Sequence, residues 1–304
     1  MTFRPVKSIT KAQATMEGAG VHLYRAFGFH KPREFDPFLL FDDFRNDDPK
    51  QFEKGFPWHP HRGIETITYV LDGEVEHGDS LGNRGVLGAG SVQWMTAGSG
   101  IMHQEMPRGN AKGQMHGFQL WANLPSSLKM TTPRYQDIQG SDIPVITDDD
   151  GTVVKIVTGA FWGKRGPVDG IAADPLYLDI SVPPNTRKTF PVDTYANTFA
   201  YVFAGAGNFR DASTPYGVRI EKEVAGDEIN IRDMTGNRTL VNFDTGNEIT
   251  VQSGPDGIRF LLISGQPIQE PVAWHGPIVM NTQGELRQAM KDLQNGTFIK
   301  DQRH

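Results

Sequence analysis

The chain has 304 residues, of which 38% are hydrophobic and 22% charged, as is typical of a globular protein with a sizeable core. Its formal net charge of −6 argues against direct nucleic-acid binding, because a phosphate backbone requires a basic protein face. The absence of cysteine excludes disulfides, iron–sulfur clusters, thiolate-bound zinc and cysteine nucleophiles, so any metal must be held by His, Asp or Glu.

The sequence shows neither a secretion signal nor a membrane span. The opening segment, MTFRPVKSITKAQATMEG, lacks the apolar core of a signal peptide. No run approaches the roughly 18 apolar residues that a membrane-spanning helix needs. We therefore expect a cytoplasmic protein with no membrane partner.

Short runs of alternating apolar and polar residues dominate the first half of the chain. The 34 glycines and 20 prolines make the chain turn-rich, which favours many short strands over long helices. The pair Asp72-Gly73 predicts a tight hairpin between two such runs. Four predicted strand regions are GVHLYRAF (20–27), ETITYVLDGEVEHGDS (65–80), GSVQWMT (90–96) and HGFQLWANLP (116–125).

A polar, proline-containing stretch at residues 125–144 interrupts this pattern, and strand-like runs then resume. They include TVVKIVTGAFWG (152–163), LYLDISVP (176–183) and IRFLLISG (258–265). A helical period is visible only near the C-terminus. There Thr282 is the predicted N-cap, Glu285 follows three residues later, and Leu286, Met290 and Leu293 share one face. The pattern predicts an all-β protein with one short C-terminal helix.

The two halves of the sequence resemble each other. The segment HPHRGIETITYVLDG (59–73) aligns without a gap on PVDTYANTFAYVFAG (191–205), and both keep a Tyr-Val pair and a closing glycine. Further on, GSVQWMTAG (90–98) matches GNEITVQSG (246–254), and GFQLW (117–121) resembles IRFLL (258–262). Each match is weak alone, but their common order predicts a duplicated β-domain.

The copies differ at polar positions. Against His59, His61 and Glu65 in the first copy, the second has Pro191, Asp193 and Asn197. Between the closing glycine and the last strand, the first copy carries SGIMHQEMPRGNAKGQMHG (99–117), whereas the second has only about four residues (255–258). The first copy therefore holds a polar insertion, and this insertion contains His103 and Glu105.

His59, His61, His103 and Glu105 have the spacing of metal ligands. In an extended strand, residues i and i+2 project from the same face, so each pair can point in one direction. Two such pairs on neighbouring strands would place three imidazoles and a carboxylate around one ion. A His-x-His pair alone is often only a polar loop, but both pairs occur in one copy and are missing from the other. The set would suit Fe(II), Mn, Ni, Co, Cu or Zn.

Other polar residues near these pairs are weaker candidates. Glu65 lies four residues after His61, and a continuous strand would put both on one face, so Glu65 is an alternative ligand or a supporting group. We expect His77 and Asp79 to be solvated strand ends. Neither a Ser-His-acid arrangement nor a glycine-rich phosphate motif is evident in the sequence.

Four stretches together resemble the pirin family of the cupin superfamily: DPFLLFDDF (36–44), HPHRGIETITYVLDG, GSVQWMTAGSGIMHQE (90–105) and HGFQLWANLP. The resemblance covers most of residues 20–130 and weakens in the second half. It implies two antiparallel β-barrel or sandwich (cupin) domains face to face. We expect an N-terminal metal-binding domain at 1–135 and a C-terminal domain without metal ligands at 136–304, ending in a helix near 283–294.

The resemblance also implies which residues form the site. Pirins have two described roles. Some are metal-dependent dioxygenases that open flavonols such as quercetin with O₂ and release CO. Others are non-catalytic metal-sensing regulators that bind a transcription factor or metabolic enzyme. Both roles imply one metal, most often Fe(II), held by the three histidines and Glu105. Glu105 is also the expected catalytic base for the flavonol hydroxyl. Further residues expected near the substrate are Asp42, Phe56, Trp58, Arg62 and Trp94.

Overall fold

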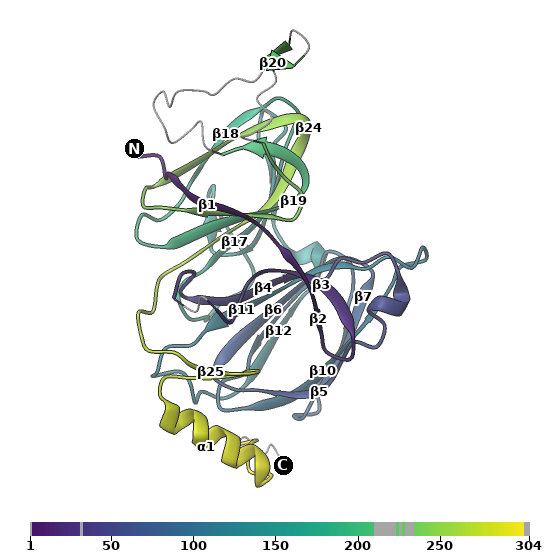
Figure 1. Ribbon diagram of the computed structural model, residues 1–304, viewed down its shortest axis with the longest axis vertical. Coiled ribbons are helices and arrows are strands. Elements are labelled where there is room, and N and C mark those ends of the chain that lie inside the picture. The colour runs from purple at the N-terminus through teal and green to yellow at the C-terminus, as the bar shows by residue number, and fades with distance from the viewer. Residues whose placement is uncertain (1, 31–32, 210–222, 225–226, 229–233, 301–304) are drawn as a thin grey trace. The chain divides into compact units, whose positions relative to one another are not determined.

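The computed structural model describes residues 2–30, 33–209, 223–224, 227–228 and 234–300. The regular secondary structure consists almost entirely of antiparallel strands, with a single α-helix in this described part (Figure 1). The predicted all-β fold with two cupin domains is confirmed. The sheets are sandwich-like and do not close into barrels. Nowhere in the described ranges is there a helix both long and apolar enough to cross a membrane.

The structure divides into two compact units. The first, called here the histidine unit, comprises Gln13–Ile143, Pro167–Ala173 and Pro267–His304. The second, called the apolar unit, comprises Met1–Ala12, Pro144–Gly166 and Asp174–Gln266. This division differs from the expected boundary at residue 135. The N-terminal strand joins the apolar unit because it pairs with a strand there, and the C-terminal helix joins the histidine unit.

Two antiparallel sheets form the histidine unit. The larger runs in the order β12-β9-β6-β11-β4-β3-β2, and the smaller in the order β5-β10-β7-β8. The strands of the larger sheet are β2 (Gln13–Glu17), β3 (Val21–Phe27), β4 (Phe38–Asp43), β6 (Ile64–Asp72), β9 (Val92–Thr96), β11 (His116–Asn123) and β12 (Arg134–Ile138). Those of the smaller sheet are β5 (Phe56–His61), β7 (Glu74–Asp79), β8 (Arg84–Leu87) and β10 (Ile101–Arg108). Short 3-10 turns lie at Pro49–Gln51 and Gly140–Asp142.

The C-terminal segment, residues 267–300, is called here the arm. It contains the hairpin β25 (Ala273–His275) and β26 (Ile278–Met280), followed by α1 (Gln283–Gln294). Thr282 caps α1 as expected: its hydroxyl accepts from the backbone N–H of Glu285, and the Glu285 carboxylate accepts from the backbone N–H of Thr282. Helix and hairpin share an apolar cluster that includes Ile278, Leu286 and Phe298. The predicted helix is therefore confirmed.

One large sheet forms most of the apolar unit, in the order β1-β23-β19-β24-β17-β14-β13, with β18 and β22 attached. Its strands are β1 (Val6–Lys11), β13 (Val145–Thr147), β14 (Val153–Thr158), β17 (Leu176–Val182), β18 (Arg187–Pro191), β19 (Asn197–Asn208), β22 (Thr235–Gly236), β23 (Thr239–Phe243) and β24 (Glu248–Gly265). Two-residue hairpin strands complete the list: β15 (Ala160–Phe161), β16 (Lys164–Arg165), β20 (Glu223–Val224) and β21 (Asp227–Glu228).

The sequence repeat corresponds to equivalent positions in the two units. Tyr69 in β6 and Tyr201 in β19 are both fully buried. Gly73 and Gly205 end the repeated segments with positive φ angles of 77° and 63°, a conformation that favours glycine. In the apolar unit β24 continues unbroken through residues 255–258, whereas the histidine unit inserts the additional strand β10 at this place.

Candidate metal centre

The two ligand pairs lie on neighbouring strands. β5 carries His59 and His61, β10 carries His103 and Glu105, and the two strands pair antiparallel with His59 directly opposite His103. β10 alternates strictly between buried and half-buried residues over most of its length, so His103 and Glu105 both point inward. A register shift between these two residues places Glu105 opposite Phe56. The insertion predicted from the sequence repeat therefore supplies the strand that brings the pairs together.

Three imidazoles converge on one point. One nitrogen of each of His59, His61 and His103 lies within 4.8 Å of the others. The ring centroids are 4.4 Å apart for His59 and His103, and 4.9 Å apart for His61 and each of the other two. Among the residues that the structure describes, these histidines form the one group of three or more potential ligands this close. Glu105 lines the same cavity but lies outside this tight group.

The hydrogen bonds of His59 and His61 fix their tautomers. Nδ1 of His59 lies 2.8 Å from the carbonyl oxygen of Pro57, and Nδ1 of His61 lies 3.2 Å from that of Pro277. A carbonyl only accepts, so each Nδ1 carries a proton, and in the neutral form of each ring Nε2 then carries a lone pair. The two Nε2 atoms are 3.1 Å apart. Two lone pairs at this distance repel each other. A cation bound by both nitrogens would remove this repulsion.

His103 gives a second reason to infer a metal. Its side chain is 1% exposed, and neither ring nitrogen has a hydrogen-bond partner within the described structure. Burial lowers the pKa of both His61 and His103 well below the usual range, and the neighbouring imidazoles add to this effect. Buried, neutral imidazoles without partners are costly unless they bind something. The donor set therefore fits a transition-metal ion, for which neutral imidazole is a preferred ligand.

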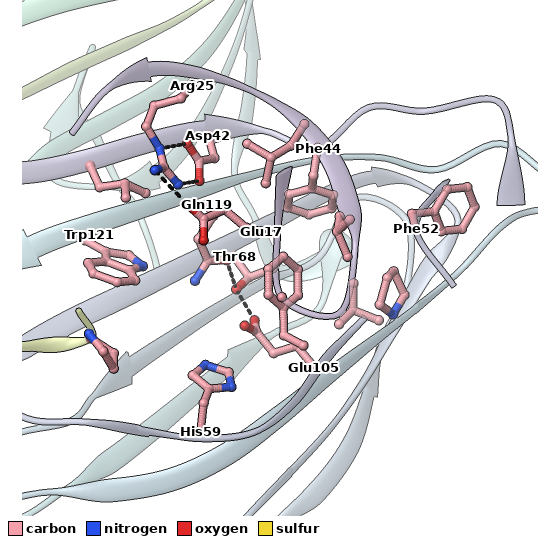
Figure 2. Close-up of a pocket in the computed structure, with 18 of the residues that line it drawn as sticks. Glu17, Arg25, Asp42, Phe44, Phe52, His59, Thr68, Glu105, Gln119 and Trp121 are labelled. Carbon is pink, nitrogen blue, oxygen red and sulfur yellow. Dashed lines mark hydrogen bonds and ion pairs between the residues drawn. The ribbon is translucent and has the colours of Figure 1, made fainter. Parts of the chain in front are cut away.

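Glu105 belongs to a short hydrogen-bonded chain beside the histidines. The hydroxyl of Thr68, on β6, lies 3.0 Å from Oε1 of Glu105 and 2.7 Å from Oε1 of Gln119, on β11 (Figure 2). Burial raises the pKa of Glu105 above its usual value. If Glu105 is protonated, it can donate to Thr68, and Thr68 can in turn donate to Gln119. The arrangement therefore suits a carboxylate that takes up a proton.

A cavity of about 400 Å³ extends from the histidines between the two sheets of the histidine unit. Its apolar wall combines aromatic rings, among them Phe44, Phe52 and Phe56, with aliphatic side chains and prolines. Trp121 lies on another side, with its ring centroid 5.1 Å from that of His61. Cavities of this size and composition bind small organic molecules. Figure 2 shows the aromatic rings and Glu105 around the same space.

A charged cluster forms a wall of this cavity beyond Gln119 (Figure 2). Arg25 donates to both carboxylate oxygens of Asp42 at 2.8 and 2.7 Å, and to Glu17 at 2.8 Å. Burial raises the pKa of Asp42 to about 6, although the paired guanidinium opposes this shift. Asp42 was expected near the substrate, and the structure places it in the cavity wall. Arg25, Glu17 and Gln119 were not singled out, because no local motif marks them.

Glu65 lies on the other face of β6. Its Oε1 accepts from the hydroxyl of Thr96 at 2.8 Å, and its carboxyl lines a separate cavity of about 390 Å³ together with Arg134. The prediction that Glu65 shares a face with His61 assumed one continuous strand. Instead, β5 ends at His61, and Gly63, with φ of 78°, turns the chain before β6 begins. Thr68 lies three positions after Glu65 in the strand, and this odd offset points the two side chains to opposite faces.

The remaining expected residues divide into two groups. Phe56 lines the cavity, as expected for a residue near the substrate. Trp58, at 52% exposure, does not line it, and Trp94 is buried outside it. Arg62 is 2% exposed and points away from the cavity toward the arm, where it pairs with Asp292.

The expectation that His77 and Asp79 are solvated strand ends is wrong. They are 7% and 6% exposed, because β7 pairs with β10 so that His77 lies opposite Glu105 and Asp79 opposite His103. Nε2 of His77 is 3.5 Å from a carboxylate oxygen of Asp137, and Asp79 accepts backbone N–H groups from the turn that follows it. The spacing of two residues between His77 and Asp79 indicates that both side chains lie on one face of the strand. Only the register with β10 shows that this face is buried.

Comparisons with known proteins show which family the chain resembles over its length. Residues 20–122 match the family model of pirin, and residues 177–299 match that of the pirin C-terminal cupin domain. A pirin-like protein of Caulobacter vibrioides is 43% identical over 98% of this chain and 100% of its own length. Human pirin is 35% identical over 92% of this chain and 88% of its own length.

A solved structure extends the comparison to the fold. The crystal structure of a quercetin 2,3-dioxygenase from Acinetobacter baumannii matches with a TM-score of 0.84 and 29% identity, covering 98% of this chain and 99% of that one. The ligand pairs, the two cupin units and these full-length similarities lead to the same conclusion. The chain belongs to the pirin family.

Proposed function

We propose that this protein is a metal-dependent dioxygenase, with Fe(II) as its metal, that opens flavonols such as quercetin with O₂ and releases CO. The observation that carries the proposal is the convergence of three imidazoles, two of them buried, beside Glu105 at a cavity of about 400 Å³ that is lined partly with aromatic rings. The similarity to a protein described as a quercetin 2,3-dioxygenase supports the same reaction.

His59, His61 and His103 would hold the metal, with Glu105 as the fourth ligand. When bound, a divalent transition metal supplies a Lewis acid for the flavonol oxygens and a redox centre for O₂. Burial lowers the pKa of His61 and of His103, so both remain neutral near pH 7 and keep a lone pair for coordination. The carbonyl of Pro277 keeps Nε2 of His61 directed toward the cluster.

Glu105 would accept the proton of the flavonol 3-hydroxyl. Its carboxylate faces the cavity beside the histidines, and proton transfer to a positioned carboxylate requires such contact with the substrate. Thr68 orients this carboxylate by donating its hydroxyl proton to Oε1 of Glu105, and once Glu105 is protonated Thr68 can donate to Gln119 instead. Because Glu105 is 8% exposed, bulk water does not compete freely for the proton.

The cavity walls would orient a planar substrate. Phe44, Phe52 and Phe56 provide apolar contact for flavonol rings, and Arg25 and Gln119 provide hydrogen-bond partners for ring hydroxyls. The aromatic walls also exclude water around the reacting carbon. Such a combination of apolar contact and a few polar groups is typical of sites that select a small aromatic molecule.

Turnover of quercetin tests this function. The protein is depleted of metal, loaded with Fe(II) under anaerobic conditions, and mixed with quercetin and then with O₂. We expect loss of the flavonol absorbance band with one CO formed per quercetin, dependent on the metal. His61→Ala should show neither.

Failure of this assay would have a defined meaning. Metal binding without any metal-dependent loss of quercetin would refute the flavonol dioxygenase. It would instead favour a metal-sensing regulator, whose affinity for a protein partner should differ between its Fe(II) and Fe(III) forms.

A further inference from the structure

The arm forms one side of the metal cavity. Gly276 and Pro277, in the turn between β25 and β26, line the cavity next to His61. Trp274 packs beside this turn, with its ring centroid 6.2 Å from that of Trp121 and 4.6 Å from that of Phe29. A segment more than two hundred residues later in the chain thus completes the surroundings of His61.

The contact between the arm and His61 is a specific hydrogen bond. Nδ1 of His61 donates to the carbonyl oxygen of Pro277 at 3.2 Å. In metal sites, the hydrogen bond made by one imidazole nitrogen fixes the ring orientation and leaves the other nitrogen to coordinate. If the Pro277 carbonyl were displaced, neither the tautomer nor the ring orientation of His61 would remain fixed.

Arg62, the next residue after His61, fastens the arm. Its Nη1 donates to Asp292 of α1 at 2.8 Å, and its Nη2 donates to the carbonyl oxygen of Phe298 at 2.7 Å. The guanidinium carbon also lies 4.2 Å from the centre of the Phe298 ring. Because Arg62 is 2% exposed, removing the charge of its carboxylate partner would leave a buried cation without compensation.

The backbone around Arg62 is joined to β26. The N–H of Val279 donates to the carbonyl oxygen of Arg62 at 3.0 Å, and Nζ of Lys129 donates to the carbonyl oxygens of both Gly63 and Val279 at 2.7 and 3.0 Å. A Cβ atom at Gly63 would lie 2.0 Å from the carbonyl oxygen of Val279, so only glycine permits this approach. Side-chain and backbone contacts therefore fix the arm at the residues that follow His61.

We propose that the arm is a working part of the metal centre and that Asp292 is a positioning residue for His61. Asp292 acts through Arg62, which holds β26 and the Pro277 carbonyl in place. The proposal rests on the proposed metal centre, but it concerns metal affinity and not the reaction that follows. Loss of the Asp292 charge therefore weakens metal binding although Asp292 contacts no ligand directly.

The test measures Co(II) binding by metal-free protein, without any flavonol present. Asp292→Asn keeps the shape of the side chain and removes its charge. We expect the Co(II) affinity to fall 10- to 100-fold, the range typical of lost supporting contacts in metal sites, and the visible absorption bands of bound Co(II) to shift.

Asp179→Asn in the apolar unit is the matched control. Asp179 is 2% exposed and accepts two hydrogen bonds from the half-buried Arg259, at 2.9 and 2.6 Å, so its replacement also disrupts the pairing of an arginine with a buried carboxylate. It should lower thermal stability yet change Co(II) affinity less than about twofold, since the pair belongs to the other unit. Equal losses of affinity in both variants would mean general destabilisation and would overturn the proposal.

A measurement on the unmodified protein decides the case if Asp292→Asn fails to fold. Nitrogen-15 NMR of the metal-free protein should show His61 protonated at Nδ1 only. A proton on Nε2, or an average of both tautomers, would overturn the proposal, as would a folded Asp292→Asn protein with unchanged Co(II) affinity.

If the wild-type protein binds no Co(II), the metal centre itself is refuted. Tight Co(II) binding without quercetin turnover refutes only the dioxygenase.

Discussion

The two units build related folds around opposite kinds of interior. In the apolar unit, aliphatic and aromatic side chains such as Phe190, Phe260 and Leu262 fill one continuous cluster. In the histidine unit, the buried apolar residues form separate clusters, and the space beside them holds three imidazoles, a carboxylate and a cavity. The same repeated strand pattern supports both. Function therefore depends on the polar residues and on the inserted strand β10, and not on the fold as such.

This difference shows how stability and chemistry are distributed. Burial and packing of apolar side chains stabilise the folded state, whereas buried polar groups destabilise it unless they are paired. The histidine unit compensates for its polar interior by pairing its charges, as in Arg25 with Asp42 and Arg62 with Asp292. Changes in the apolar unit should therefore affect stability alone, and changes around the histidine cavity should affect metal binding, proton uptake or turnover.

The largest effect on stability is expected from Phe260→Ala in the apolar unit. Phe260 is fully buried and packs edge-to-face against Phe190 and Phe209. Creating this cavity should lower the free energy of unfolding by about 3–5 kcal/mol. Urea denaturation measures the loss, and metal content of the folded variant should stay unchanged. A simultaneous loss of metal would contradict the separation of roles between the units.

The histidine unit should show a pH-dependent stability that comes from Asp42. Burial raises its pKa from 3.8 to about 6, so the folded state binds this proton more tightly than the unfolded state. The stabilisation is fully present below about pH 3.8 and is lost as the pH rises through about 6. Over this window it amounts to ~3 kcal/mol.

Urea denaturation of metal-free wild type and Asp42→Asn between about pH 4 and pH 7.5 isolates this contribution. Wild type should lose stability relative to the variant as the pH rises, since the amide of the variant has no proton to release. A difference between the two proteins that does not vary with pH would show that Asp42 is ionised throughout.

A smaller effect on turnover is expected from Thr68→Val. The substitution keeps the shape of the side chain but removes the hydroxyl that orients Glu105. Loss of one hydrogen bond of about 1 kcal/mol should lower kcat about fivefold, with unchanged metal content. Steady-state kinetics with quercetin provide the measurement. An unchanged kcat would remove the Thr68–Gln119 chain from the mechanism.

The smallest effect is expected from Glu65→Gln. Its carboxyl lies on the face of β6 opposite to Thr68 and lines a separate cavity. Co(II) affinity should change less than about twofold, whereas Glu105→Gln should weaken it clearly. If the two variants were equally impaired, Glu65 would have to contribute to the metal centre.

Much of this arrangement is readable from the sequence. Alternating patterns predict the strands, and Thr282 and Glu285 predict the start of α1. The sequence repeat predicts a duplicated β-domain with a polar insertion in the first copy, and the resemblance to pirins implies that both domains are cupins. The ligand pairs follow from spacing within a strand. Each of these features depends on residues that are close together in the chain, or on a short segment that occurs twice. They can therefore be recognised in one amino-acid sequence.

Contacts between distant segments are not readable in the same way. The orientation of Glu65 depends on the turn at Gly63, and the burial of His77 depends on the register between β7 and β10. The pairing of Arg62 with Asp292 joins residues far apart in the chain, and no local pattern marks either partner. These features are set by tertiary packing.

Metal stoichiometry tests most directly whether the histidine unit alone holds the ion. Metal-free wild type and His103→Ala are incubated with excess Fe(II) under anaerobic conditions, separated from unbound metal, and analysed for iron per chain. We expect one iron per wild-type chain and none retained by His103→Ala, with quercetin turnover lost in parallel. Iron retained in full by His103→Ala, or absent from wild type, would contradict the proposed centre.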